Sequence, residues 1–186
     1  MSQLHKYQDL ISLFNQAFGD TENTLLMKGQ DEPIYIPAET SHGKHRIIFA
    51  HGYFASALHE IAHWCIAGKE RRLLEDYGYW YCPDGRSEAE QAEFEKVEVK
   101  PQAIEWAFCC AANKPFQVST DNLNGAPVDR KAFQIAVREQ ALVYLRNGFP
   151  ARAGCFIQVL RDFYQTSELS VASFDLTEKR ESITNV

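Results

Sequence analysis

Residues 46–68 read RIIFAHGYFASALHEIAHWCIAG, a stretch that predicts a strand followed closely by a helix. The first five residues, Arg46–Ala50, are short, apolar and rich in β-branched isoleucine, which favours a strand. From Ser56 to Ala67 apolar residues recur at helical spacing, and Gly68 stands where a helix commonly ends. The remaining predicted elements lie on either side of this pair.

The flanking sequence predicts further helices and short strands, and therefore an α+β fold. The prolines on either side of Ile34–Ile36 suit an edge strand. Ser87 is the expected N-cap of a long helix, in which Pro101 should force a kink or a break. The predicted elements are, in order, a helix at 4–18, strands at 33–37 and 46–50, helices at 56–67 and 87–113, a strand at 116–119, and helices at 129–146 and 152–164. We expect one compact domain at 1–176 and a polar tail at 177–186.

The composition is that of an ordinary globular domain. The chain has 186 residues, 45% of them hydrophobic and 24% charged, so it can bury a sizeable core. Its formal net charge of -6 is a poor match for a nucleic-acid backbone. The five cysteines include no C-x-x-C pair and indicate reduced thiols. Since neither a signal peptide nor an apolar stretch of membrane-span length is visible, we expect a cytoplasmic protein that does not enter membranes.

The strongest functional pattern is His59-Glu60-Ile61-Ala62-His63, an H-E-x-x-H sequence inside a helix that is predicted independently of it. Residues four apart lie on one face of a helix, so both imidazoles can reach a single metal ion. The alternative is a pair of unrelated histidines, one in the core and one at the surface. The spacing and the helical setting together favour metal binding.

Two histidines do not complete a catalytic metal site, which needs a third protein ligand and open positions for substrate. No histidine follows His63, so we expect a carboxylate from the next predicted helix. The candidates are Glu93, Glu95, Glu98 and Glu105. We choose Glu98, because Val97 and Val99 give it the more apolar setting.

A site with two histidines and one carboxylate serves two chemistries. With zinc it holds a hydrolytic water, whereas with ferrous iron it leaves positions for dioxygen. Glu60 would be the general base of a zinc peptidase, and in an iron enzyme it could order a bound water or make a supporting hydrogen bond. The ligand types alone do not separate these two alternatives.

Several longer runs resemble the bacterial elongation factor P hydroxylase family. The resemblance extends over roughly residues 5 to 175, and long distinctive runs make it far more specific than H-E-x-x-H alone. The runs are 31–35 (DEPIY), 48–57 (IFAHGYFASA), 59–69 (HEIAHWCIAGK), 77–86 (YGYWYCPDGR) and 97–103 (VEVKPQA).

The resemblance implies an Fe(II)-dependent enzyme that uses dioxygen to hydroxylate the β-lysylated lysine of elongation factor P. It implies His59, His63 and Glu98 as metal ligands, and iron rather than zinc. The sequence contains no G-x-G-x-x-G nucleotide fingerprint, so no nucleotide cofactor is expected. A zinc-dependent metallopeptidase and a non-catalytic metal-stabilised adaptor are the alternatives. We take the monomer as the default state.

A lysyl-lysine side chain is long and carries two ammonium groups, so its channel should combine aromatic walls with carboxylates. We hypothesise that the loop before Ser87 and the segment before the first predicted strand line this channel. The residues proposed to bind substrate are Asp31, Glu32, Tyr79, Trp80, Tyr81 and Asp84. In the alternative interpretation the aromatic residues belong to the core and Asp84 only makes a turn.

Overall fold

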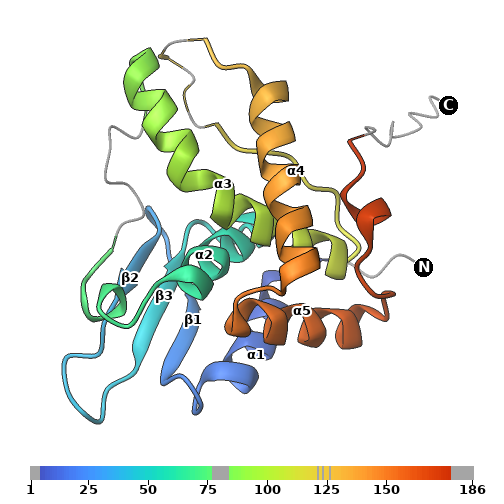
Figure 1. Ribbon diagram of the computed structural model, residues 1–186. Coiled ribbons are helices and arrows are strands. Elements are labelled where there is room, and N and C mark those ends of the chain that lie inside the picture. The colour runs from blue at the N-terminus through green and yellow to red at the C-terminus, as the bar shows by residue number, and fades with distance from the viewer. Residues whose placement is uncertain (1–4, 77–83, 121, 123, 126, 177–186) are drawn as a thin grey trace, which may run out of the picture.

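The computed structural model describes residues 5–76, 84–120, 122, 124–125 and 127–176. Within these residues, five α-helices pack with one three-stranded sheet, which confirms the predicted α+β class (Figure 1). The elements are α1 (Tyr7–Phe18), β1 (Thr24–Lys28), β2 (Ile34–Ile36), β3 (His45–Phe49), α2 (Phe54–Ile66), the 3-10 helix η1 (Arg71–Leu73), α3 (Glu88–Ala111), α4 (Arg130–Asn147), α5 (Ala151–Tyr164) and the 3-10 helix η2 (Val171–Phe174).

The sheet has the order β1-β3-β2, with β3 in the centre. β2 pairs with it in antiparallel orientation as the predicted edge strand, and β1 pairs in parallel. β1 was not predicted. Its Leu26 is paired with Ile47 of β3 on one side. On the other side, the Leu26 amide donates to the side-chain oxygen of Asn15 at 2.7 Å, so α1 supplies a hydrogen-bond partner that a neighbouring strand would otherwise provide.

α2 lies at the centre of the molecule, between the sheet and α3 (Figure 1). A tight turn leads into it from β3, with positive φ values at His51 (53°) and Gly52 (78°). Its fully buried residues are Ala57, Leu58, Ile61 and Ala62. At its end, Arg152 of α5 donates to the carbonyl oxygens of Trp64 (2.8 Å) and Ala67 (2.6 Å), which would otherwise lack partners within the helix. The helix of the H-E-x-x-H sequence is therefore held along its side and at its end.

α3 begins with the predicted cap, a capping box between Ser87 and Glu90. The helix runs through Pro101 without a break, because buried residues on both sides of Pro101 hold it against the core. The strand predicted at 116–119 is absent from that described segment. There the side-chain amide of Gln102 pairs with the backbone of Ser119 through bonds of 2.8 and 3.0 Å.

The last two predicted helices are confirmed as α4 and α5. α5 contributes Phe156 to an aromatic cluster in which Phe14 and Phe18 of α1 pack around Trp64 of α2. This cluster joins the N-terminal and C-terminal parts of the chain. Across the described residues, no helix combines the length and the apolar character that crossing a membrane requires.

Candidate metal centre

α2 places the two histidines of the H-E-x-x-H sequence on the same face, one helical turn apart. The Nε2 atoms of His59 and His63 lie 3.0 Å from each other. Both side chains are partly buried, with exposed fractions of 24% and 28%. The two imidazoles therefore converge on one point, as the spacing predicts.

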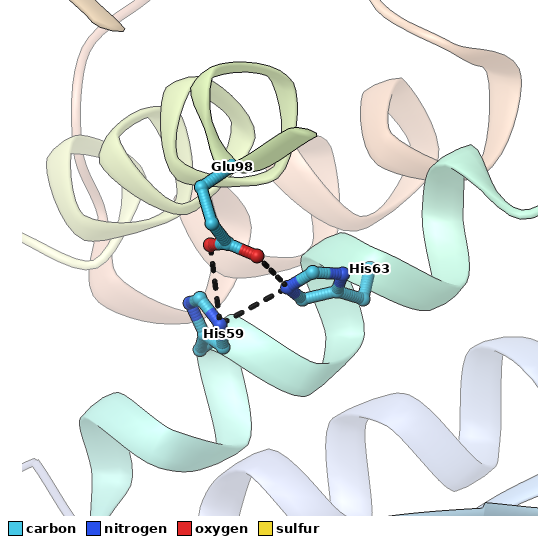
Figure 2. Close-up of side chains that lie close together, drawn as sticks. All are labelled: His59, His63 and Glu98. Atoms are coloured by element: carbon cyan, nitrogen blue, oxygen red, sulfur yellow. Dashed lines mark hydrogen bonds and ion pairs between the residues drawn. The ribbon is translucent and has the colours of Figure 1, made fainter. Parts of the chain in front are cut away.

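α3 supplies the third group, because Glu98 faces the two histidines across the contact between α2 and α3 (Figure 2). One carboxylate oxygen lies 3.1 Å from His63 Nε2, and the other lies 3.7 Å from His59 Nε2. Glu98 is buried, with only 4% of its surface exposed. A carboxylate this deep in a protein needs positive partners, and the histidines or an ion beside them provide these.

The three residues fit a metal ion. Their ligand atoms all lie within 4.8 Å of one another. Two ligands of one ion, each at about 2.1 Å from it and at right angles, would be about 3 Å apart. The two Nε2 atoms are 3.0 Å apart, and they lie 3.1 and 3.7 Å from the Glu98 oxygens, which is close to this value. The set of two imidazoles and one carboxylate is one that zinc and ferrous iron both accept.

Two further side chains on α3 support the ligands. Glu105 accepts a hydrogen bond from His59 Nδ1 at 2.8 Å, which leaves Nε2 of that ring to face the metal position. Gln102 donates to Glu98 at 3.2 Å. Gln102 and Glu105 stand four and seven positions after Glu98, so they share one helical face with it. The sequence offered Glu105 as a candidate ligand, and helical spacing places it on the face of Glu98 without showing that its partner is His59.

Charge within this cluster shifts two pKa values in opposite directions. Burial lowers the pKa of His59, but the hydrogen bond and charge of Glu105, together with the charge of Glu98, outweigh burial and raise it to about 10. Burial raises the pKa of Glu98, but its contacts with His63 and His59 prevail and lower it to about 2. Burial raises the pKa of Glu60. The raised pKa of His59 favours its protonated form in the metal-free protein, so a metal ion bound through this ring would have to displace a proton.

A cavity of about 430 Å³ opens beside the ligands. His63 and Glu98 line it, as does Glu60. His59 is not among the described residues that line the cavity. This agrees with the hydrogen bond between the His59 ring and Glu105. The remaining described lining residues are Tyr35, Ile47, Trp64, Ile66, Ala67, Gly68, Arg71, Arg72, Asp76, Arg86, Phe94, Val97 and Pro101.

The residues predicted to bind substrate form three groups. Asp31 and Glu32 are exposed in the loop before β2, and neither lines the cavity. Asp84 accepts hydrogen bonds from Gly85 (2.7 Å) and from the backbone (3.0 Å) and side chain (2.6 Å) of Asn124, so it joins two segments that are 40 residues apart in the sequence. The predicted aromatic residues, Tyr79, Trp80 and Tyr81, lie outside the described residues. Substrate contacts by this set stay a prediction.

Comparison with known proteins identifies the family. The sequence model of the elongation factor P hydroxylases matches residues 13–174. The chain belongs to the elongation factor P hydroxylase family. A relative from Haemophilus influenzae, named elongation factor P lysine hydroxylase, is 53% identical over 174 residues, which are 93% of this chain and 98% of that protein. The family resemblance seen in the sequence is thereby confirmed.

Proposed function

We propose that this protein hydroxylates the β-lysylated lysine of elongation factor P, with Fe(II) held by His59, His63 and Glu98 and with dioxygen as co-substrate. The observation that carries the proposal is the convergence of these three side chains beside a cavity that His63 and Glu98 line, in a member of this family. When bound, Fe(II) would supply the activation of dioxygen. The protein would position the side chain and exclude water.

The cavity offers features that suit a long alkyl side chain. Its wall includes the apolar residues Ile47, Phe94 and Val97, against which methylene groups can pack. His63 and Glu98 face the same space, so a carbon atom of the side chain can lie next to the metal position. Apolar walls also exclude bulk water, which protects a reactive centre from side reactions.

The overall reaction fixes what else must be supplied. One oxygen atom of dioxygen enters a C–H bond of the substrate and the other leaves as water. This balance requires two electrons and two protons, which a reductant has to deliver. We therefore include a soluble two-electron reductant, such as ascorbate, in every assay of the proposed activity.

The test is mass analysis of β-lysylated elongation factor P after incubation with the metal-free protein reconstituted with Fe(II) or with Zn(II). We expect a gain of one oxygen atom with Fe(II) and none with Zn(II). Replacing His63→Ala should abolish the gain, whereas the exposed His42→Ala should not. Cleavage of the substrate, or an unchanged mass with iron fully bound, would contradict the proposal.

The proposal has two consequences for how the enzyme works in the cell. Its protein substrate acts on the ribosome, so the enzyme should act in the cytoplasm. The three ligands and the described cavity wall come from one chain, so a monomer would suffice for the reaction.

A further inference from the structure

We propose that the Glu60 carboxylate binds an ammonium group of the substrate side chain and thereby sets a preference for a cationic side chain. The inference rests on the proposed function, because it takes the modified lysine as the occupant of the cavity. Glu60 follows His59 directly on α2 and precedes His63 by three residues. It lines the cavity together with His63 and Glu98, so it faces the space in which the substrate would lie.

The other charged groups in one part of the cavity wall already have partners. Asp76 accepts from two nitrogen atoms of Arg71, Nε at 2.8 Å and Nη2 at 2.7 Å. Arg72 pairs with Glu22 at 2.9 Å, although Glu22 itself is not part of the wall. These pairs are neutral overall, so this part of the wall does not call for a charged ligand.

The remaining charged groups of the described wall also have partners, with one exception. Glu98 is shared by the two histidines, and the guanidinium of Arg86 donates to Gln91 at 2.9 Å and to the Thr120 carbonyl oxygen at 2.9 Å. Glu60 is different. Among the charged side chains described in this wall, it alone makes neither a hydrogen bond nor an ion pair with another described residue. A half-buried carboxylate in this position is stabilised by a cation that enters the cavity.

The described aromatic residues are less well placed to bind the cation. The guanidinium of Arg86 lies 3.8 Å from the centre of the Phe94 ring. Trp64 has Arg152 at 4.7 Å and Arg72 at 6.0 Å from its ring. Because arginines already lie against these two rings, a substrate ammonium would have to compete with them for the same faces. The carboxylate of Glu60 has no such competitor.

The spacing of Glu60 and His63 on α2 also defines what a contact between Glu60 and a substrate ammonium group would do. Side chains three apart on a helix have Cβ atoms about 5–6 Å from each other. An ammonium group held by Glu60 would therefore place a carbon a few bonds away beside His63 and Glu98. Glu60 would select for charge and would also fix how far the side chain enters.

The experiment measures binding in the absence of dioxygen, so that no turnover occurs. Two semisynthetic forms of elongation factor P differ only in the modified side chain, with the amines of its β-lysyl group either free or acetylated. The Fe(II)-loaded wild type should bind the free-amine form roughly tenfold or more tightly than the acetylated form. Glu60→Gln should reduce this preference to less than about threefold, while Glu39→Gln, an exposed control, should keep it.

Two further measurements keep the result interpretable. Glu60→Gln should not lower the melting temperature, because no partner of Glu60 is lost, and Glu60→Ala serves as a second variant. Both variants should still bind one metal ion per chain. If the wild type binds two ions and Glu60→Gln binds one, Glu60 is a metal ligand and the inference is overturned. It is also overturned if Glu60→Gln retains the full preference, or if the wild type shows none.

These outcomes are distinct from failure of the proposed function. A wild type that hydroxylates elongation factor P but binds both forms equally well would overturn the role of Glu60 alone. A wild type that binds the free-amine form selectively but never adds oxygen would overturn the proposed function. In the second case the charge preference of the cavity would still be measured.

Discussion

At the scale of single residues, Glu98 is the group on which we expect metal binding to depend most. Among the described residues, its buried carboxylate is the one acidic group that lies within 4 Å of the Nε2 atoms of both histidines. We expect Glu98→Ala to lower the affinity for Fe(II) by more than about a hundredfold, since a ligand is lost and two imidazoles remain. Competition titration with a chelating dye measures this. Glu93→Ala, an exposed change on the same helix, is the control, and equal affinities for the two variants would refute the assignment.

Glu105 contacts His59, and we expect it to influence metal binding through that ring. We expect Glu105→Leu to weaken metal binding by about 10–100-fold, because the ring of His59 loses the acceptor that orients it. Glu105→Gln keeps an acceptor and loses only the charge, so its effect should be smaller. The same dye titration ranks the two variants. If both lose affinity to the same extent, hydrogen bonding by Glu105 does not orient the ring.

The raised pKa of His59 predicts a pH-dependent stability in the metal-free protein. The pKa in the folded state is about 10, above the ordinary value of 6.5. The favourable contact with Glu105 is therefore fully present below pH 6.5 and is lost as the pH rises through about 10. Glu105→Leu should reduce the free energy of unfolding by about 2–3 kcal/mol near pH 6 and by much less above pH 10. Urea unfolding of chelator-treated proteins provides the comparison, and a pH-independent difference would contradict it.

At the scale of elements, the end of α2 depends on one side chain from α5. Arg152 donates to three carbonyl oxygens there, those of Trp64, Cys65 and Ala67. Arg152→Met should lower the free energy of unfolding by about 2–3 kcal/mol, because charged hydrogen bonds to buried acceptors are lost. Denaturant titration measures the change. Arg146→Met, which alters an exposed residue, should have little effect, and a similar loss in both variants would argue against a specific cap.

The elements also show where sequence patterns are sufficient. β3, α2 and α3 were predicted because β-branched residues, helical periodicity and the Ser87 cap act locally. β1 was missed because its sequence TLLMK has no strand-specific pattern, and its pairing with β3 and Asn15 is made by distant residues. The strand expected at 116–119 does not form, because a side chain, Gln102, takes the place of a neighbouring strand.

The proposed metal ligands follow the same rule. His59 and His63 could be predicted because their spacing on a helix decides their arrangement. For the third ligand the sequence offered four carboxylates. The apolar neighbours of Glu98 favoured it, but the sequence alone did not decide among the four. The contact of Glu105 with His59 depends on how α2 packs against α3, which no local pattern describes.

At the scale of the whole molecule, the net charge of -6 does not by itself explain recognition of a cationic side chain. The described cavity wall contains as many arginines (Arg71, Arg72, Arg86) as acidic residues (Glu60, Asp76, Glu98). The described wall as a whole therefore carries no excess of acidic groups. What distinguishes the cavity is how these charges are paired, and Glu60 is the carboxylate left for a ligand.

We propose that this centre inserts oxygen from dioxygen into the modified lysine. The most direct measurement is mass analysis of elongation factor P after reaction of the Fe(II)-loaded protein under dioxygen labelled with the heavy oxygen isotope. We predict that the added oxygen carries the label and that His63→Ala gives no addition. An added oxygen that comes from unlabelled water, or the absence of any addition by an iron-loaded wild type, would contradict the claim.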